Sequence, residues 1–236
     1  MDRVDMVAAH AAEAMHSVAV QDNPFPHLLV PDLLPADVYR AALAHWPERA
    51  SMAVAQPDYY LHRYSTVLDE RWLATLNPEV AEVWRAVRAA LCGPAAIDAL
   101  LTRFPAAVER LRMFGSGAPV PNVCLIEDEG GHAILPHTDT PATALTALLY
   151  MPETTGEPQL GTALYRPHEP VARSAGYTYH PREGFEHVGT APYLPNRLLA
   201  FAPGDTTFHG VEPVTGPAIR RLVRLFAFAD TRGPRR

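Results

Sequence analysis

The chain has 236 residues, of which 48% are apolar and 19% are charged, a composition typical of one compact domain with a sizeable core. The formal net charge of −6 and the shortness of the basic clusters give no general attraction to phosphate backbones, so no nucleic-acid partner is expected. Two cysteines without CxxC spacing exclude a disulfide framework, and no stretch approaches the roughly 20 apolar residues of a membrane span. We therefore expect a soluble cytoplasmic protein without a membrane partner, either a monomer or a homodimer.

Helical periodicity dominates the first half of the chain. Apolar residues at helical spacing predict helices over residues 3–18, 35–47 and 78–91, and a further helix that ends near Phe104. A short strand is expected at His27–Val30, between the first two helices. Proline or glycine separates these segments from one another.

From Val108 onward, apolar and polar residues alternate, and glycine or proline recurs every several residues. This pattern predicts strands near residues 107–114, 121–127, 133–139, 143–151, 161–166, 185–190, 197–202, 206–212 and 219–229. Helices followed by strands indicate an α+β protein, and many short strands in succession favour a jelly roll or sandwich. The longest irregular stretch of this half, residues 167–184, is a candidate lid.

Two histidines and one aspartate form the strongest chemical signal of the sequence. His137 and Asp139 are two residues apart, so on a strand both side chains project from one face. His209 lies 72 residues after His137 in another β-patterned run. Two imidazoles and one carboxylate are the ligands that hold non-haem Fe(II) with open coordination positions. A His-x-Asp triplet alone is weak, since a hydrogen-bonded strand histidine beside a solvated aspartate gives the same pattern.

Three arginines occupy the last predicted strand, among mostly apolar neighbours. Alternation leaves two choices: either Arg220 and Arg224 face inward, or Arg221 does so alone. A buried guanidinium needs an anion, and a ligand carboxylate fits its planar fork. The ordinary alternative is an edge strand whose arginines face water. We favour Arg220 as the inward residue.

Together these motifs resemble the Fe(II)- and 2-oxoglutarate-dependent dioxygenases, in particular small stand-alone bacterial members of the prolyl-hydroxylase type. The segments that carry the resemblance are residues 24–35, 136–141, 161–167 and 208–214, with Arg220. Many relatives have Arg-x-Ser at this point, whereas Leu222 occupies the serine position here. The resemblance implies a double-stranded β-helix (jelly roll) with N-terminal helices packed on the outside. We expect one domain over 1–236, with a mainly helical support region over 1–106, a jelly-roll core over 107–229 and a flexible tail over 230–236.

The same resemblance implies a chemistry. Fe(II) would be held by His137, Asp139 and His209, and Arg220, or failing that Arg221, would bind the distal carboxylate of 2-oxoglutarate. With O2 as the third reactant, the enzyme would oxidise a C–H bond of a small metabolite, releasing succinate and CO2. Hydroxylation is expected ahead of desaturation or cyclisation, and the Asp139 carboxylate argues against a halogenase. The alternative from another class is a jelly-roll metal-binding protein, either a zinc-loaded isomerase or a catalytically silent binder.

Further residues are expected around such a site on weaker grounds. Asn122 and Tyr150 lie on strands that could face the interior beside the co-substrate. The candidate substrate contacts are Arg63, Tyr64, Arg112, Tyr165 and Arg224. Arg63 and Tyr64 belong to a dense aromatic and basic group, residues 59–64, which a packed surface loop would explain equally well.

Overall fold

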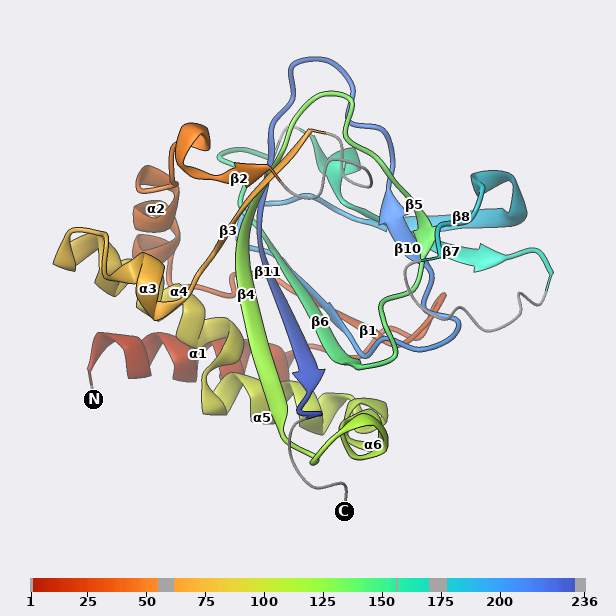
Figure 1. Cartoon of the computed structure of the whole chain (residues 1–236), viewed down its shortest axis with the longest axis horizontal. Helices are drawn as coiled ribbons and strands as arrows, with labels where there is room; N and C mark the ends of the chain where they lie inside the picture. The colour runs from red at the N-terminus through yellow and green to blue at the C-terminus, as the bar shows by residue number, and fades with distance from the viewer. Residues whose placement is uncertain (1, 55–61, 156, 170–177, 232–236) are drawn as a thin grey trace.

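The computed structural model describes residues 2–54, 62–155, 157–169 and 178–231, and within them the chain is a mixed α/β structure with two antiparallel sheets. Figure 1 shows helices gathered on one side of the larger sheet and the smaller sheet on the other side. The helices are α1 (Arg3–Ser17), α2 (Ala36–Ala44), α3 (Glu70–Leu73), α4 (Pro78–Cys92), α5 (Pro94–Arg103) and α6 (Pro105–Phe114). Short 3-10 turns occupy Arg49–Ser51, Pro158–Leu160 and Arg182–Gly184.

The larger sheet has seven strands in the order β1-β9-β6-β11-β4-β3-β2. Their bounds are β1 (His27–Val30), β9 (Leu198–Phe201), β6 (Thr143–Tyr150), β11 (Arg220–Ala229), β4 (Pro119–Asp128), β3 (Arg63–Val67) and β2 (Ala53–Val54). The smaller sheet has four strands in the order β5-β10-β7-β8. These are β5 (Ile134–His137), β10 (His209–Val211), β7 (Thr162–Pro167) and β8 (Phe185–Ala191).

The central strand β11 separates two environments, because successive side chains of a strand point to opposite faces. Val223, Leu225 and Ala227 are buried in the main core, which they share with helices α1, α4 and α5. Leu222 belongs to a second cluster, between the two sheets. The helices therefore cover one face of the large sheet, and its other face meets the small sheet.

No single described helix is long and apolar enough to cross a membrane; only the sharply bent run Pro78–Arg103 with Pro105–Phe114 reaches the required length and composition. Both parts of this run contribute buried side chains to the main core, among them Trp84, Leu100 and Leu111. Core helices commonly satisfy such a criterion.

Most predicted elements are present within one to three residues, but the strand predicted near 107–114 is wrong. Residues Pro105–Phe114 form α6 instead. Pro105 occupies the first helical turn, where its missing N–H costs nothing, and Ala107 and Leu111 share one buried face at a spacing of four. Strands β2 and β3 were not predicted, since Arg63–Val67 is largely polar.

The predicted regional division and tail are only partly visible. Helix α6 runs across the predicted boundary at residue 106, and the first 106 residues also supply β1, β2 and β3 to the large sheet. Most of the predicted tail, 232–236, and residues 170–177 of the predicted lid lie outside the described residues.

Asn196 ties the N-terminal segment to the large sheet. Its side chain accepts a hydrogen bond from the Leu34 N–H at 2.9 Å and donates one to the Leu34 carbonyl at 2.7 Å. Its own carbonyl accepts from the Leu33 N–H at 3.1 Å. Asn196 is buried and has a φ of 57°, a left-handed conformation that asparagine adopts more readily than most residues.

Asn196→Ala is expected to lower the free energy of unfolding by about 2–4 kcal/mol, because it removes two buried hydrogen bonds and puts a Cβ-bearing side chain without local compensation at positive φ. Asn196→Gly loses the same hydrogen bonds, but glycine adopts the positive φ without strain. Its free energy of unfolding should therefore be about 1 kcal/mol higher than that of the alanine variant. Urea denaturation of both variants measures the difference. A loss below about 0.5 kcal/mol for the alanine variant would contradict this role.

Candidate metal centre

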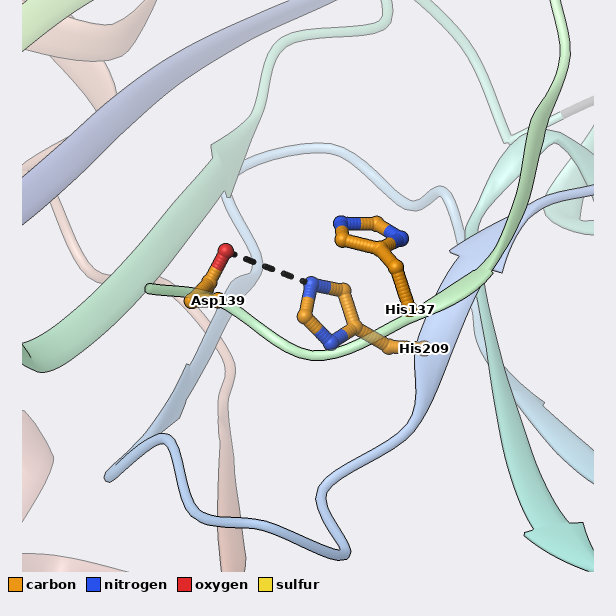
Figure 2. Close-up of side chains that lie close together, drawn as sticks. All are labelled: His137, Asp139 and His209. Carbon is orange, nitrogen blue, oxygen red and sulfur yellow. Dashed lines mark ion pairs between the residues drawn. The ribbon is translucent and has the colours of Figure 1, made fainter. Parts of the chain in front are cut away.

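Three side chains from two neighbouring strands converge between the sheets. His137 is the last residue of β5 and His209 the first of β10, and the two are direct partners in the ladder. Asp139 follows two residues after β5 ends. Each residue offers one ligand atom, and these atoms all lie within 4.8 Å of one another. Figure 2 shows Asp139 facing His209, whose Nε2 lies 3.9 Å from the carboxylate Oδ1.

Backbone and side-chain contacts orient these three groups. The Nδ1 atoms of His137 and His209 each lie 3.0 Å from a carbonyl oxygen, of Leu135 and Thr207 respectively. A carbonyl oxygen accepts, so each Nδ1 carries the proton and each Nε2 keeps a free lone pair for a metal. The Thr146 hydroxyl donates to Asp139 Oδ2 at 2.6 Å, which leaves Oδ1 on the side of the histidines.

Electrostatics favour the neutral imidazole that a metal requires. Burial, together with the neighbouring His209, lowers the pKa of His137 to about 4 against the opposing effect of Asp139. The donor set, two imidazole nitrogens and one carboxylate oxygen, therefore fits a divalent ion. The cavity beside these three residues has room for further ligands of such an ion.

That cavity lies between the two sheets and is lined by the three residues and by the inner face of the large sheet. Arg220, Leu222, Arg224, Phe226 and Phe228 of β11 line it in sequence, which is every second residue of the strand. Tyr179 also lines the cavity, and its ring lies 5.2 Å from that of His137. The described end of the predicted lid stretch thus reaches the site.

Arg220 lies fully buried at one end of the cavity. Its Nε donates to the Leu160 carbonyl at 2.6 Å, and one terminal nitrogen donates to Asp128 Oδ2 at 2.8 Å. The other terminal nitrogen lies 3.5 Å from the Thr162 hydroxyl oxygen, which also accepts from the Tyr150 hydroxyl at 2.7 Å. Arg220 is therefore held rigidly with one edge toward the cavity.

Asp128 is the carboxylate that Arg220 and Arg63 share. Arg63 donates to both of its oxygens, at 2.6 and 2.9 Å, from strand β3. Burial alone would raise the pKa of Asp128, but the Arg63 guanidinium, with His132 and Arg220, holds this pKa at about 2. Asp128 is thus an anion in the folded protein at any ordinary pH.

Several predicted site residues lie elsewhere. Arg221 points to the opposite face of β11, where it pairs with Glu127 at 2.8 Å. Arg112 is exposed on α6 rather than on a strand, which removes the basis for its prediction. Tyr165 packs on the outer face of β7 with Phe185 and donates to Glu212, so it does not line the cavity.

Of the other predicted neighbours, Tyr64, Asn122 and Tyr150 do not line the cavity. Tyr64 is directed away from the cavity, and its hydroxyl donates to Glu129 at 3.1 Å. Asn122 lies beyond Cys124 on β4 and accepts a hydrogen bond from its thiol. Tyr150 is buried behind Thr162, with its ring 5.8 Å from the Arg220 guanidinium carbon. Arg63 and Arg224 do line the cavity.

The residues that sequence reasoning missed are Thr146, Asp128 and Thr162. Each is a fully buried polar residue near or within an apolar run, as in Thr143–Tyr150, where eight consecutive residues are buried. A polar side chain at the inward parity of a buried strand needs a partner, and that is the signal that could have found Thr146.

No protein-family model and no curated protein matches the chain. Solved structures do match. A prolyl-4-hydroxylase from Pseudomonas putida is 16% identical with a TM-score of 0.57, covering 94% of this chain and 100% of that one. The non-haem α-ketoglutarate-dependent carbocyclase SnoK from nogalamycin biosynthesis is 17% identical with a TM-score of 0.53, covering 92% and 83%.

A third match is HygX from Streptomyces hygroscopicus, solved with nickel and 2-oxoglutarate bound. It is 14% identical with a TM-score of 0.51, covering 87% of this chain and 83% of that one. These likenesses show that the chain shares the fold of the prolyl-4-hydroxylase and of 2-oxoglutarate-dependent enzymes.

Asp128→Asn is expected to destabilise the protein by about 3–5 kcal/mol near neutral pH, since it removes a buried carboxylate to which two guanidiniums donate. The pKa of Asp128 is depressed from 3.8 to about 2, so its contribution is present above about pH 4 and disappears as pH falls toward 2. The gap between wild type and variant should shrink over that range in urea denaturation.

The matched control is Glu153→Gln, because Glu153 is an exposed carboxylate 3.8 Å from Arg221. An exposed pair contributes at most about 1 kcal/mol. Equal effects of the two substitutions would contradict the structural role assigned to Asp128.

Proposed function

We propose that the chain is an Fe(II)- and 2-oxoglutarate-dependent oxygenase with a jelly-roll core. The single observation that carries the proposal is that one cavity holds both the His137-Asp139-His209 group and a buried, anchored arginine. The three ligands would hold the metal, and Arg220 would bind the distal carboxylate of 2-oxoglutarate. A metal site alone would not call for a buried guanidinium at the other end of its cavity.

When bound, Fe(II) and 2-oxoglutarate would together activate O2 for oxidation of a substrate C–H bond, with release of succinate and CO2. The chain supplies position and environment. Thr146 holds the Asp139 carboxylate in its ligand orientation, and Ile126, Leu148 and Leu222 give the cavity apolar walls that limit access of water.

The absence of serine at position 222 is compensated within the cavity. Leu222 contributes an apolar wall, and the hydroxyl beside the Arg220 guanidinium comes from Thr162 on β7. Thr162 itself lines the cavity and is oriented by Tyr150. A carboxylate between Arg220 and Thr162 would receive donors from two strands of different sheets, so Arg220 is assigned this role in preference to Arg221.

The proposed substrate is a small metabolite, and the proposed reaction is hydroxylation ahead of desaturation or cyclisation. HygX was solved with hygromycin B, and SnoK comes from nogalamycin biosynthesis, so this fold accommodates small molecules. A prolyl hydroxylase from Trichoplax adhaerens was solved with a peptide fragment, so the fold alone does not select the substrate. The Asp139 carboxylate, held beside both histidines, argues against halogenation.

Anaerobic addition of Fe(II) and 2-oxoglutarate to the metal-free protein should produce a visible charge-transfer band, and removal of the metal by a chelator should abolish it. His209→Ala and Asp139→Ala should prevent the band, since each removes one of three ligands. His187→Ala is the control, because that histidine is exposed on β8, where its ring contacts the Thr190 hydroxyl and the Tyr165 ring, and it does not line the cavity. A well-folded, metal-loaded wild type without the band would favour the metal-binding alternative.

Arg220→Leu should raise the 2-oxoglutarate concentration for half-maximal band intensity by about 100-fold, because it removes charge-assisted hydrogen bonds from a buried site. Arg220→Lys keeps the charge without the planar fork and should lose less. Iron binding, measured by isothermal calorimetry, should be preserved in both. Arg221→Leu, on the opposite face of the same strand, should leave the requirement unchanged; the reverse pattern would transfer the role to Arg221.

A further inference from the structure

Arg224 is a second arginine on the cavity face of β11, and within the described part of the chain it has no anionic partner. It lies four residues from Arg220 and lines the same cavity, with Leu222 between them. Among the described residues no carboxylate forms an ion pair with it, and its Nε is buried without a hydrogen-bond acceptor. One of its terminal nitrogens lies 3.7 Å from the Cys124 sulfur, and its guanidinium carbon lies 4.1 Å from the centre of the Phe226 ring.

The strand register places Arg224 one inward pair away from the pair that contains Thr146, the residue that contacts Asp139. Arg224 is paired with Leu148 of β6, and the next inward pair along the ladder joins Phe226 to Thr146, the residue that holds Asp139. Arg220 is about 13 Å farther along β11, since four residues of a strand span that distance. Arg224 therefore faces the part of the cavity nearest the proposed reaction centre.

Arg224 is half-buried, and its Nε is removed from water without an acceptor among the described residues. A buried charged donor without a partner is unfavourable, so its retention here indicates a ligand that supplies an acceptor. The Phe226 ring supports its flat face and leaves its donor edge free, as in many carboxylate-binding sites. Beyond Arg224 the same face continues with Phe226 and Phe228, and Leu148 and Leu222 flank it. A positive group thus sits within an apolar lining.

We propose that Arg224 selects the substrate, and that the substrate is a small acid: an apolar body that packs on Phe226 and Phe228, with an anionic group bound by the Arg224 guanidinium. This inference rests on the proposed function. In that function Arg220 binds a carboxylate of 2-oxoglutarate, which leaves Arg224 to bind the anionic group of the substrate. Recognition of a buried anion would also fix which C–H bond faces the metal.

The test uses matched acid and amide pairs as probes: 3-phenylpropanoate against 3-phenylpropanamide, and hexanoate against hexanamide. Each is titrated by isothermal calorimetry into the anaerobic wild-type protein loaded with Fe(II) and 2-oxoglutarate. At least one acid should bind about tenfold or more tightly than its amide, because a buried charge-assisted hydrogen bond is worth that much. Arg224→Leu should abolish the preference, and Arg224→Lys should keep part of it.

Two controls separate the roles of the arginines. Arg221→Leu, on the opposite face of β11, should retain the full acid preference. The 2-oxoglutarate requirement of Arg224→Leu should stay within about threefold of wild type, well below the shift expected of Arg220→Leu.

The inference is wrong if no acid binds better than its amide, or if the preference survives in Arg224→Leu. It is also wrong if Arg224→Leu loses 2-oxoglutarate as strongly as Arg220→Leu, because Arg224 would then bind the co-substrate. Calorimetry does not depend on the charge-transfer band. Failure of the proposed function would appear as an absent band in the wild-type protein, and failure of the Arg224 inference would appear in the calorimetric acid preference.

Discussion

The alternation of side chains along strand β11 is the constraint on which the rest of the structure depends. This strand is paired on both sides, with β4 and β6, over nearly its whole length. Its odd-numbered residues Val223, Leu225 and Ala227 are committed to the helical core. A shift of one residue would exchange these apolar side chains with Arg220 and Arg224, which would put two guanidiniums into the main core and turn Arg221 toward the cavity in their place. The packing of the helices therefore fixes the polarity of the cavity.

Two buried carboxylates on β4, Asp128 and Glu127, each pair with two arginines. Asp128 pairs with Arg63 and Arg220 on the cavity side of β4, whereas its neighbour Glu127 pairs with Arg49 and Arg221 on the other side. The same alternation thus sorts two adjacent carboxylates into two separate networks. A shift of register would separate these pairs and leave the two buried carboxylates without their partners, so the networks oppose such a shift in addition to the apolar core.

Local pattern was enough to predict most strands and the three residues that come together as the candidate metal centre. His137 and Asp139 are two residues apart, and on or next to a strand this spacing places both side chains on the same face. The pairing of Arg220 with Arg224 on one face followed from alternation as well. What alternation alone could not decide was which parity faced the cavity, and this depends on the helices that cover the opposite face.

Long-range partners could not be predicted, because no local rule connects them. Asp128 and Arg63 are 65 residues apart in sequence, and β3 was missed because its polar composition is that of a loop. Arg112 was misplaced because Val108, Leu111 and Met113 satisfied a loose strand pattern, whereas Pro105 and the Ala107–Leu111 spacing carried the stronger helical signal. Tyr165 was assigned to a strand correctly, but its parity follows from the outer cluster of Phe185 and Phe208, which is assembled from distant segments.

The two cavity arginines of β11, Arg220 and Arg224, differ in how firmly they are held, and this difference matches the two ligands proposed for them, a constant co-substrate and a variable substrate. Arg220 has a carbonyl, a carboxylate and a hydroxyl around its guanidinium, so its position is determined before any ligand arrives. Such preorganisation suits a co-substrate that binds in every turnover. Arg224 has only a thiol and an aromatic ring, contacts that impose little directional preference. A side chain held in this way would be able to adjust its donor edge to the proposed acid substrate, while the rigid arginine four residues away would hold the proposed co-substrate beside the His137-Asp139-His209 group.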